Sequence, residues 1–152
     1  MSILKKHLTL LAFTVLFSTI AFSQTAKLVK ADKNFANFNF QSAIEHYLAL
    51  VKSGYKATTK GHVTARLGDS YRLINDPKNA ELWYRIAVES DNCEPITYFY
   101  LAQVLRSNQK YDEIGKWLNK YLKSVPEHDA GIKELANFRS YDKIYSDSTG
   151  IF

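Results

Sequence analysis

Residues 67–87 read LGDSYRLINDPKNAELWYRIA, and this stretch decides the fold. Leu67, Gly68 and Tyr71 stand at i, i+1 and i+4, which places them on one side of a helix. The second half of the stretch carries small and aromatic residues at i, i+4 and i+7, the spacing of one face of a second helix: Ala80, Tyr84 and Ala87. Between the halves, Asp76 is a good helix N-cap and Pro77 suits a first helical position. The stretch therefore predicts two helices joined by a tight turn.

The same pattern recurs along the chain. A shift of 34 residues again gives apolar or small residues: Leu101, Ala102, Leu105, Ile114, Leu118 and Tyr121. A further shift of 34 repeats the pair Leu67-Gly68 as Leu135 and Ala136. A shift of 37 residues towards the N-terminus from the small and aromatic residues of the second helix gives Ala43, Tyr47 and Leu50. A period of 34 residues is that of a repeated two-helix unit. Small residues such as Gly68 and Ala80 are expected where two helix backbones approach closely.

These positions predict an all-α solenoid of about three helical hairpins with a C-terminal capping helix. The expected helices cover residues 25–37, 40–53, 57–74, 77–90, 95–107, 111–124 and 128–145. A cap is expected because a stack of hairpins leaves its last apolar face uncovered. Residues 146–152 are expected to form a linker or frayed tail, so the repeat domain spans residues 24–145.

The N-terminus has the features of a secretory signal peptide. Lys5 and Lys6 precede an almost wholly apolar stretch from Leu8, and small residues follow at Ala21 and Ser23. We predict cleavage after Ser23 and export to the periplasm or cell envelope. The alternative is an uncleaved membrane anchor, but the apolar stretch of about 15 residues is short of the roughly 20 that span a bilayer. We therefore expect contact with the membrane to be indirect at most.

Composition and motif content predict no chemistry for the chain. The net charge of +5 comes without a run of five like charges, so nucleic acid is not an expected partner. The histidines have no metal-ligand spacing and Cys93 is the single cysteine, so we expect no metal, and the scattered glycines form no phosphate loop. We expect no catalytic residues, no cofactor and no small-molecule substrate. A Cys-dependent enzyme, built from Cys93, a histidine and a carboxylate, is the remaining rival.

The repeat resembles the tetratricopeptide repeat (TPR), whose pattern has Leu-Gly, Tyr, a central Ala, an aromatic residue, a second Ala and a closing Pro. The second repeat matches through the residues of 67–87 given above, and it has Asn92 where the family has the closing Pro. The third repeat has Leu101, Ala102 and Pro126, with Ile114 in place of the central Ala. The first repeat is the weakest match. The resemblance covers about residues 25–145 and implies a protein-binding solenoid.

A narrower resemblance involves the sequence after the predicted signal peptide. Ala-Asp-Lys-x-Phe at residues 31–35 and Phe-Gln-Ser-Ala-Ile-Glu-His-Tyr at residues 40–47 are similar to the start of bacterial OmpA-family envelope proteins. In those proteins TPRs precede a β-propeller and an OmpA-like domain, and some serve secretion or gliding machinery. The resemblance implies partners among envelope components.

In TPR proteins the first helix of each hairpin lines a concave groove. The 34-residue period predicts three rows of groove residues: Asp32, Asp69 and Gln103; Phe35, Arg72 and Arg106; and Leu28, Ala65 and Phe99. Stacked Arg72 and Arg106 would suit a carboxylate or an acidic peptide. The alternative is that Asp69 and Arg72, at i and i+3, merely pair on a solvated face. Ala65 and Asp69 replace the Lys and Asn of the carboxylate-clamp TPR proteins, which argues against a receptor for chaperone tails.

The sequence thus predicts a periplasmic scaffold or adaptor that belongs to an outer-membrane or envelope assembly. The partner segment would lie along the groove. Two alternatives stay open beside the enzyme: an N-terminal module of a larger OmpA-like secretion or gliding protein, or a module that binds through its convex face.

Overall fold

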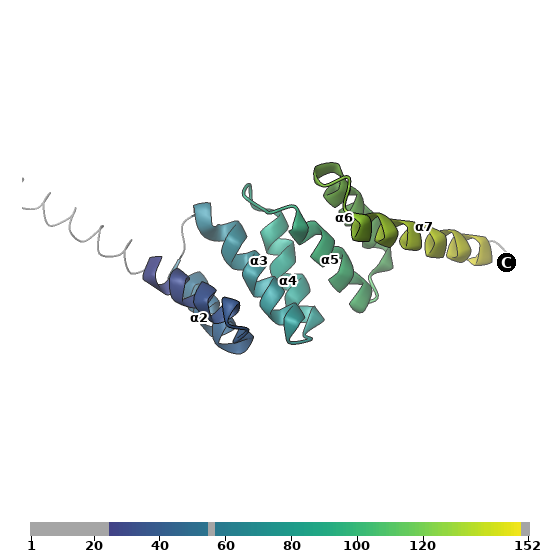
Figure 1. Ribbon diagram of the computed structural model, residues 1–152. Helices are drawn as coiled ribbons and strands as arrows, with labels where there is room; N and C mark the ends of the chain where they lie inside the picture. Colours follow the sequence, from purple (N-terminus) through teal and green to yellow (C-terminus); the bar gives the residue numbers. More distant parts are fainter. Residues whose placement is uncertain (1–24, 55–56, 150–152) are drawn as a thin grey trace, which may run out of the picture. The chain divides into compact units, whose positions relative to one another are not determined.

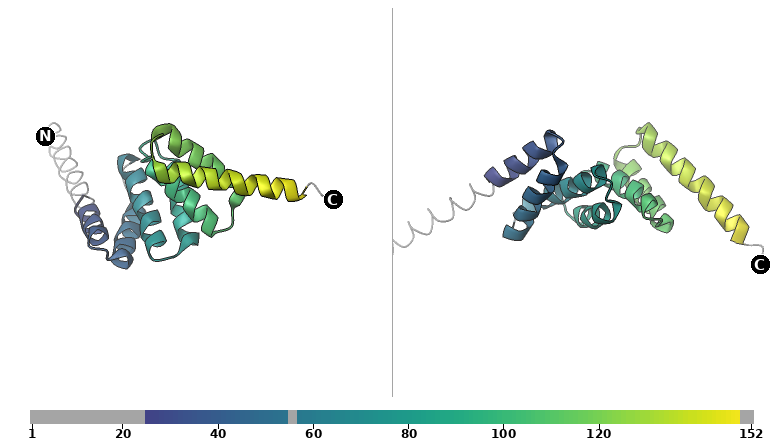
Figure 2. Two further views of the ribbon diagram at one scale, coloured as in Figure 1. Left: turned by 45° about the vertical axis from the view of Figure 1, so that its right-hand side comes forward. Right: turned by 90° about the horizontal axis from the view of Figure 1, so that it is seen from below.

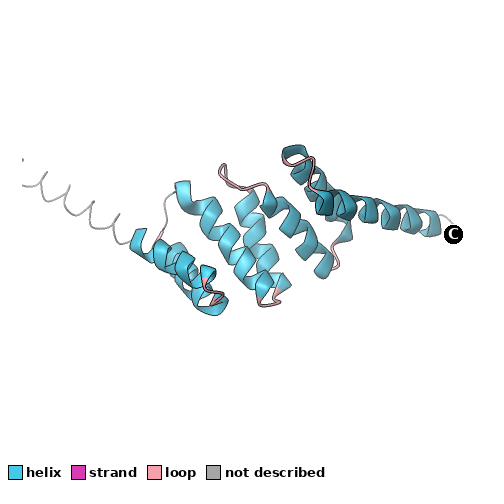
Figure 3. Cartoon of the chain, in the orientation of Figure 1, coloured by secondary structure: helices cyan, strands magenta, loops and turns pink. Residues whose placement is uncertain are grey.

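The structure is a computed structural model that describes residues 25–54 and 57–149, and every regular element in these ranges is a helix (Figure 3). The predicted signal peptide, residues 1–23, lies outside the described residues. None of the described helices is both long enough and apolar enough to cross a bilayer. The chain divides into two compact units, residues 1–55 and residues 56–152.

The first unit contains one described hairpin. Residues 25–36 are helical, and α2 spans Phe40–Ser53. Ala31 and Ala43 are fully buried between the two helices, together with Tyr47. Small side chains at these points let the backbones approach closely, as the sequence predicted.

The second unit contains five helices in chain order: α3 (Ala57–Leu73), α4 (Pro77–Val88), α5 (Ile96–Ser107), α6 (Tyr111–Ser124) and α7 (Asp129–Thr149) (Figure 1). Each helix packs on the next, and α3 also touches α5. This is the arrangement of stacked two-helix repeats. Together with the hairpin of the first unit, it confirms the predicted all-α solenoid architecture.

The core of the second unit consists of the side chains that recur every 34 residues. Leu67, Leu101 and Leu118 are fully buried, and each contributes about 1.5–3 kcal/mol by leaving water. Gly68 lies against the ring of Tyr84, where an added Cβ would come within 3.0 Å of three ring carbons. The glycine is therefore required by packing between α3 and α4.

The hairpin turns repeat the same backbone geometry. Phe38, Asn75 and Gln109 each adopt the left-handed conformation, with φ of 60°, 62° and 61°. In each turn the next residue's N–H bonds back to a carbonyl five residues earlier, as Asp76 does to Tyr71 at 2.8 Å. Asp76 then caps α4, because its carboxylate accepts the N–H of Asn79 at 3.1 Å. The backbone of the turns therefore repeats along the chain, as the core side chains do.

The predicted helix bounds differ from the structure mainly at two ends. The helix predicted for residues 77–90 ends at Val88, where the N–H of Ser90 turns back to the carbonyl of Ala87. The last helix continues through Thr149, although residues 146–149 were expected in a linker. No Pro or Gly stands between Gly131, near the start of the helix, and Gly150, so nothing local stops the helix. Figure 2 shows α7 projecting away from α6.

Candidate functional site

Three arginines on α3 and α5 form the candidate site, which we call the arginine face: Arg66, Arg72 and Arg106. Arg66 and Arg72 lie one turn to either side of Asp69, with nitrogen–oxygen distances of 3.2 and 3.8 Å to its carboxylate. Arg106, on α5, forms an ion pair with Glu134 of α7. Asp69 thus pairs with two of these arginines and Glu134 with the third.

Arg72 is held firmly by aromatic neighbours. Its Nε donates to the hydroxyl of Tyr84 at 3.0 Å, and its guanidinium carbon lies 4.1 Å from the ring centre of Tyr100. Burial alone would lower the pKa of Arg72, but Tyr84, Asp69 and Tyr100 together raise it above its ordinary value. Its side chain is therefore charged and fixed in direction, which favours recognition of a planar carboxylate.

The Asp69 carboxylate points inward and connects α3 to α4. It is buried, and the Tyr84 hydroxyl donates to it at 2.7 Å. Burial and the neighbouring Asp69 raise the pKa of Tyr84, so its hydroxyl stays protonated as the donor. The same bond exists in the first unit, where Tyr47 donates to Asp32 at 2.6 Å. Asp32 and Asp69, which were predicted in one row of the groove, therefore each connect the two helices of their own hairpin by a hydrogen bond.

The two predicted aromatic groove residues both contact other rings. Phe99 is buried, and its ring centre lies 5.3 Å from those of both Tyr121 and His128. Phe35, in the first unit, is half-buried and lies edge-on to Phe40, with ring centres 5.5 Å apart. The period predicted the helices of these residues but not the direction of the rings, because an aromatic side chain can turn towards residues beyond its own helix.

A small pocket opens beside Arg72. It has a volume of about 210 Å³ and is lined by residues from the end of α3, the following turn and α5: Arg72, Asn75, Pro77, Gln103, Val104 and Ser107. Arg72 and Gln103, which the sequence analysis placed in two different rows of the predicted groove, thus line the same pocket. Arg106 follows Gln103 by three residues and lies on the same side of α5.

The exposure of the charges decides what this face offers to a partner. The side chains of Arg66, Arg72 and Arg106 are 36%, 27% and 42% exposed, whereas those of Asp69 and Glu134 are each 13% exposed. The positive groups reach solvent while the negative groups lie beneath them. The face is therefore cationic towards a partner and suits carboxylates.

Two observations bear on the metal and cysteine chemistry considered from the sequence. They contain no cluster of three His, Cys, Asp or Glu side chains placed to hold a metal. Burial raises the pKa of the Cys93 thiol, and its Sγ lies 3.5 Å from the carbonyl of Glu94. A thiol that resists ionisation is a poor nucleophile.

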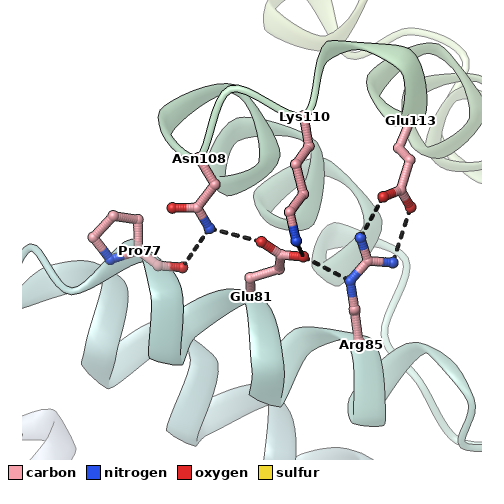
Figure 4. A network of polar contacts seen from close by, with 6 residues as sticks. All are labelled: Pro77, Glu81, Arg85, Asn108, Lys110 and Glu113. Carbon is pink, nitrogen blue, oxygen red and sulfur yellow. Dashed lines mark hydrogen bonds and ion pairs between the residues drawn. The ribbon is translucent and has the colours of Figure 1, made fainter.

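Sequence reasoning missed a second polar cluster, which joins α4 to the α5–α6 turn (Figure 4). Glu81 accepts from Arg85 at 2.8 Å, from Asn108 at 2.7 Å and from Lys110 at 2.6 Å. Arg85 in turn grips Glu113 with both terminal nitrogens, at 2.9 and 2.5 Å. Only the Glu81–Arg85 spacing of four residues was visible in the sequence. We call this group the Glu81 cluster.

Comparison with known proteins shows the fold. No protein-family model matches the chain, and no curated protein matches it. Among solved structures it resembles the first TPR of Spaghetti (RPAP3) bound to the HSP90 peptide SRMEEVD, with a TM-score of 0.65 and 17% identity over 78% of this chain and 94% of that one. The second TPR domain of human RPAP3, in complex with the HSP70 peptide SGPTIEEVD, has a TM-score of 0.65 and 15% identity over 76% and 98% of the two chains. The first TPR domain of human RPAP3 gives 0.64 and 16% over 85% and 97%.

Proposed function

We propose that this chain is a TPR-type binding module whose arginine face holds an acidic segment of a partner protein. The observation that carries the proposal is that three partly exposed arginines lie beside Asp69 and Glu134, two carboxylates that are much less exposed than the arginines. A guanidinium binds a carboxylate through two parallel hydrogen bonds, which gives direction as well as attraction. The pocket between Arg72 and Gln103 provides room for a side chain of the bound segment.

The structural neighbours support the class of ligand. Two of them are bound to peptides that end in Glu-Glu-Val-Asp. In this chain Asp69 stands where the carboxylate-clamp proteins have Asn, and it accepts a hydrogen bond from the Tyr84 hydroxyl. It is therefore not placed to bind the terminal carboxylate of a peptide. We therefore propose acidic side chains of a segment, rather than a chaperone tail, as the ligand.

The proposed location is the periplasm or cell envelope, with the signal peptide removed after Ser23. The basic, apolar and small-residue regions of residues 1–23 support export. In this setting the module is an adaptor of an outer-membrane or envelope assembly, or the N-terminal module of a larger OmpA-like protein. Mass spectrometry of the protein from an envelope fraction tests this, since a chain that begins at Met1 would contradict cleavage.

A pull-down from the envelope fraction of the source cells tests the binding role. The double variant Arg72→Glu/Arg106→Glu should lose an acidic partner that the unmodified chain retains. Lys30→Glu/Arg139→Glu makes the same change in charge at exposed positions elsewhere and should retain it. Circular dichroism must show equal helix content in all variants, because Arg72 and Arg106 also contact Tyr84 and Glu134. Equal capture by both double variants would refute the arginine face as the binding site.

A further inference from the structure

A second surface runs along α4, on residues that the arginine face does not use. Two hollows, of about 1020 and 420 Å³, share Leu82 and Arg85 in their linings. The larger extends from the α3–α4 turn over Pro77, the first residue of α4, and the smaller reaches Glu89 with Trp117 in its wall. The two hollows adjoin at the residues that they share, and together we call them the α4 trough.

The middle of the α4 trough presents an exposed apolar side chain. Leu82 is 52% exposed, although it lies in the middle of a well-packed helix. Ile86 follows it by one turn and lines the same hollow, together with Val88 and Trp117. A row of apolar side chains at i and i+4 along a trough is the feature that an amphipathic partner helix recognises.

Hydrogen-bonded residues of the Glu81 cluster line the larger hollow. Glu81 is only 8% exposed, and it accepts hydrogen bonds from Arg85, Asn108 and Lys110 (Figure 4). Side chains that are already fixed lose little conformational freedom when a partner binds. The hydrogen-bonded side chains of the Glu81 cluster are therefore already ordered before a partner binds. Their charges pair with one another rather than with the partner.

Unpaired lysines flank the Trp117 end. Lys60 lines the smaller hollow, and Lys116 lies with its Nζ 4.7 Å from the ring centre of Trp117. The Nζ of Lys120 lies 4.4 Å from the ring centre of Tyr98, which stacks on Trp117. None of these lysines forms an ion pair among the described residues. A partner with carboxylates at this end would complement them.

We propose that the α4 trough binds an amphipathic helix of a partner protein, with apolar residues on Leu82 and Ile86 and acidic residues facing Lys116 and Lys120. The trough follows α4 from Pro77 to Glu89, about 18 Å at 1.5 Å per residue. A helix of roughly 12 residues fills this length. The module thus has two binding surfaces, and this one is independent of the arginine face.

Synthetic helical peptides test the proposal directly. The probe is an acidic amphipathic peptide with Leu at i, i+3, i+4 and i+7 and Glu elsewhere. A basic version carries Lys for Glu, and a third peptide has the acidic composition with its Leu residues spread around the helix. Binding is measured by fluorescence anisotropy. The NMR signal of the Trp117 indole N–H reports the site in a Trp83→Phe background.

We expect the acidic amphipathic peptide to bind and to shift the Trp117 signal. Leu82→Asn removes the apolar contact without adding charge, and it should weaken binding at least about tenfold. Lys116→Glu/Lys120→Glu should weaken it by at least as much, whereas Arg72→Glu/Arg106→Glu should leave it unchanged.

Four outcomes overturn the proposal. The first is no binding, and the second is equal binding of the basic peptide or of the peptide with spread Leu residues. The third is binding that survives Leu82→Asn but is lost in Arg72→Glu/Arg106→Glu, which would place the peptide on the arginine face. The fourth is self-association of the free chain that Leu82→Asn abolishes, since a second copy would then occupy the trough.

Discussion

Replacing Glu81 by Gln tests how strongly the Glu81 cluster joins the second and third hairpins. Gln has nearly the same shape, but it loses the negative charge and turns an NH₂ group towards donors. The Glu81 carboxylate accepts from Arg85, Asn108 and Lys110. The change therefore removes charge-assisted bonds and leaves donors facing one another.

The size of the effect follows from what each partner can do afterwards. Hydrogen bonds to a charged group contribute about 1.5–3 kcal/mol each. Arg85 and Lys110 are partly exposed and can be hydrated, Arg85 keeps Glu113, and Asn108 keeps its bond to the carbonyl of Pro77. We therefore expect the free energy of unfolding to fall by about 2 kcal/mol, roughly a 30-fold change in the unfolding equilibrium.

Urea unfolding followed by circular dichroism measures this change. The matched control is Glu113→Gln, which breaks the more exposed side of the same cluster and should cost at most about 1 kcal/mol. A loss below about 0.5 kcal/mol for Glu81→Gln, or an equal loss for both variants, would refute a structural role for the buried carboxylate.

Three further predictions concern pH and the core. Burial alone would raise the pKa of Glu81, but the bonds from Lys110, Arg85 and Asn108 lower it below its usual 4.5. The ionised Glu81 carboxylate therefore stabilises the fold fully above about pH 4.5, and this stabilisation is lost as the pH falls through the lowered pKa. In an acid titration, the free energy of unfolding should therefore fall less steeply with pH in Glu81→Gln than in the unmodified chain. Gly68→Ala pushes a Cβ into the Tyr84 ring and should lower the unfolding free energy by about 1–3 kcal/mol in a urea titration, and a neutral result would contradict the packing between α3 and α4. Tyr84→Phe removes the bond to Asp69 and should cost about 1–2 kcal/mol by thermal unfolding, with no loss counting against a stabilising role for this bond.

The sequence predicted the fold closely because the repeat period is a backbone property. Small residues such as Gly68 and Ala80 must recur wherever helices approach, and the left-handed turn residues Phe38, Asn75 and Gln109 recur with them. The last helix was predicted too short, because the polar residues 146–149 resemble a tail although nothing in them breaks a helix.

The candidate site was predicted only in part. The period assigned Arg72 and Gln103 to separate rows of one groove, and the structure places both in the lining of one pocket, but the period could not show that Asp69 turns inward to Tyr84. One signal was available, since Asp and Tyr stand 15 residues apart in both Asp32–Tyr47 and Asp69–Tyr84.

Ion pairs between hairpins could not be predicted from the sequence, because the two partners of each pair are far apart in the chain. Arg85 and Glu113 are 28 residues apart, and a spacing of this kind becomes meaningful only once the helices are stacked. Arg106 of α5 and Glu134 of α7 likewise join two helices that are separated by another helix in the chain.

Site-specific photo-crosslinking in cells tests the central claim most directly. A photoreactive amino acid at Gln103, beside Arg72 in the small pocket, should capture a partner through a segment rich in Asp and Glu. The same group at Glu45, an exposed position on α2, serves as the control and should not capture that segment. Capture of a segment without acidic residues, or equal capture from both positions, would contradict recognition by the arginine face.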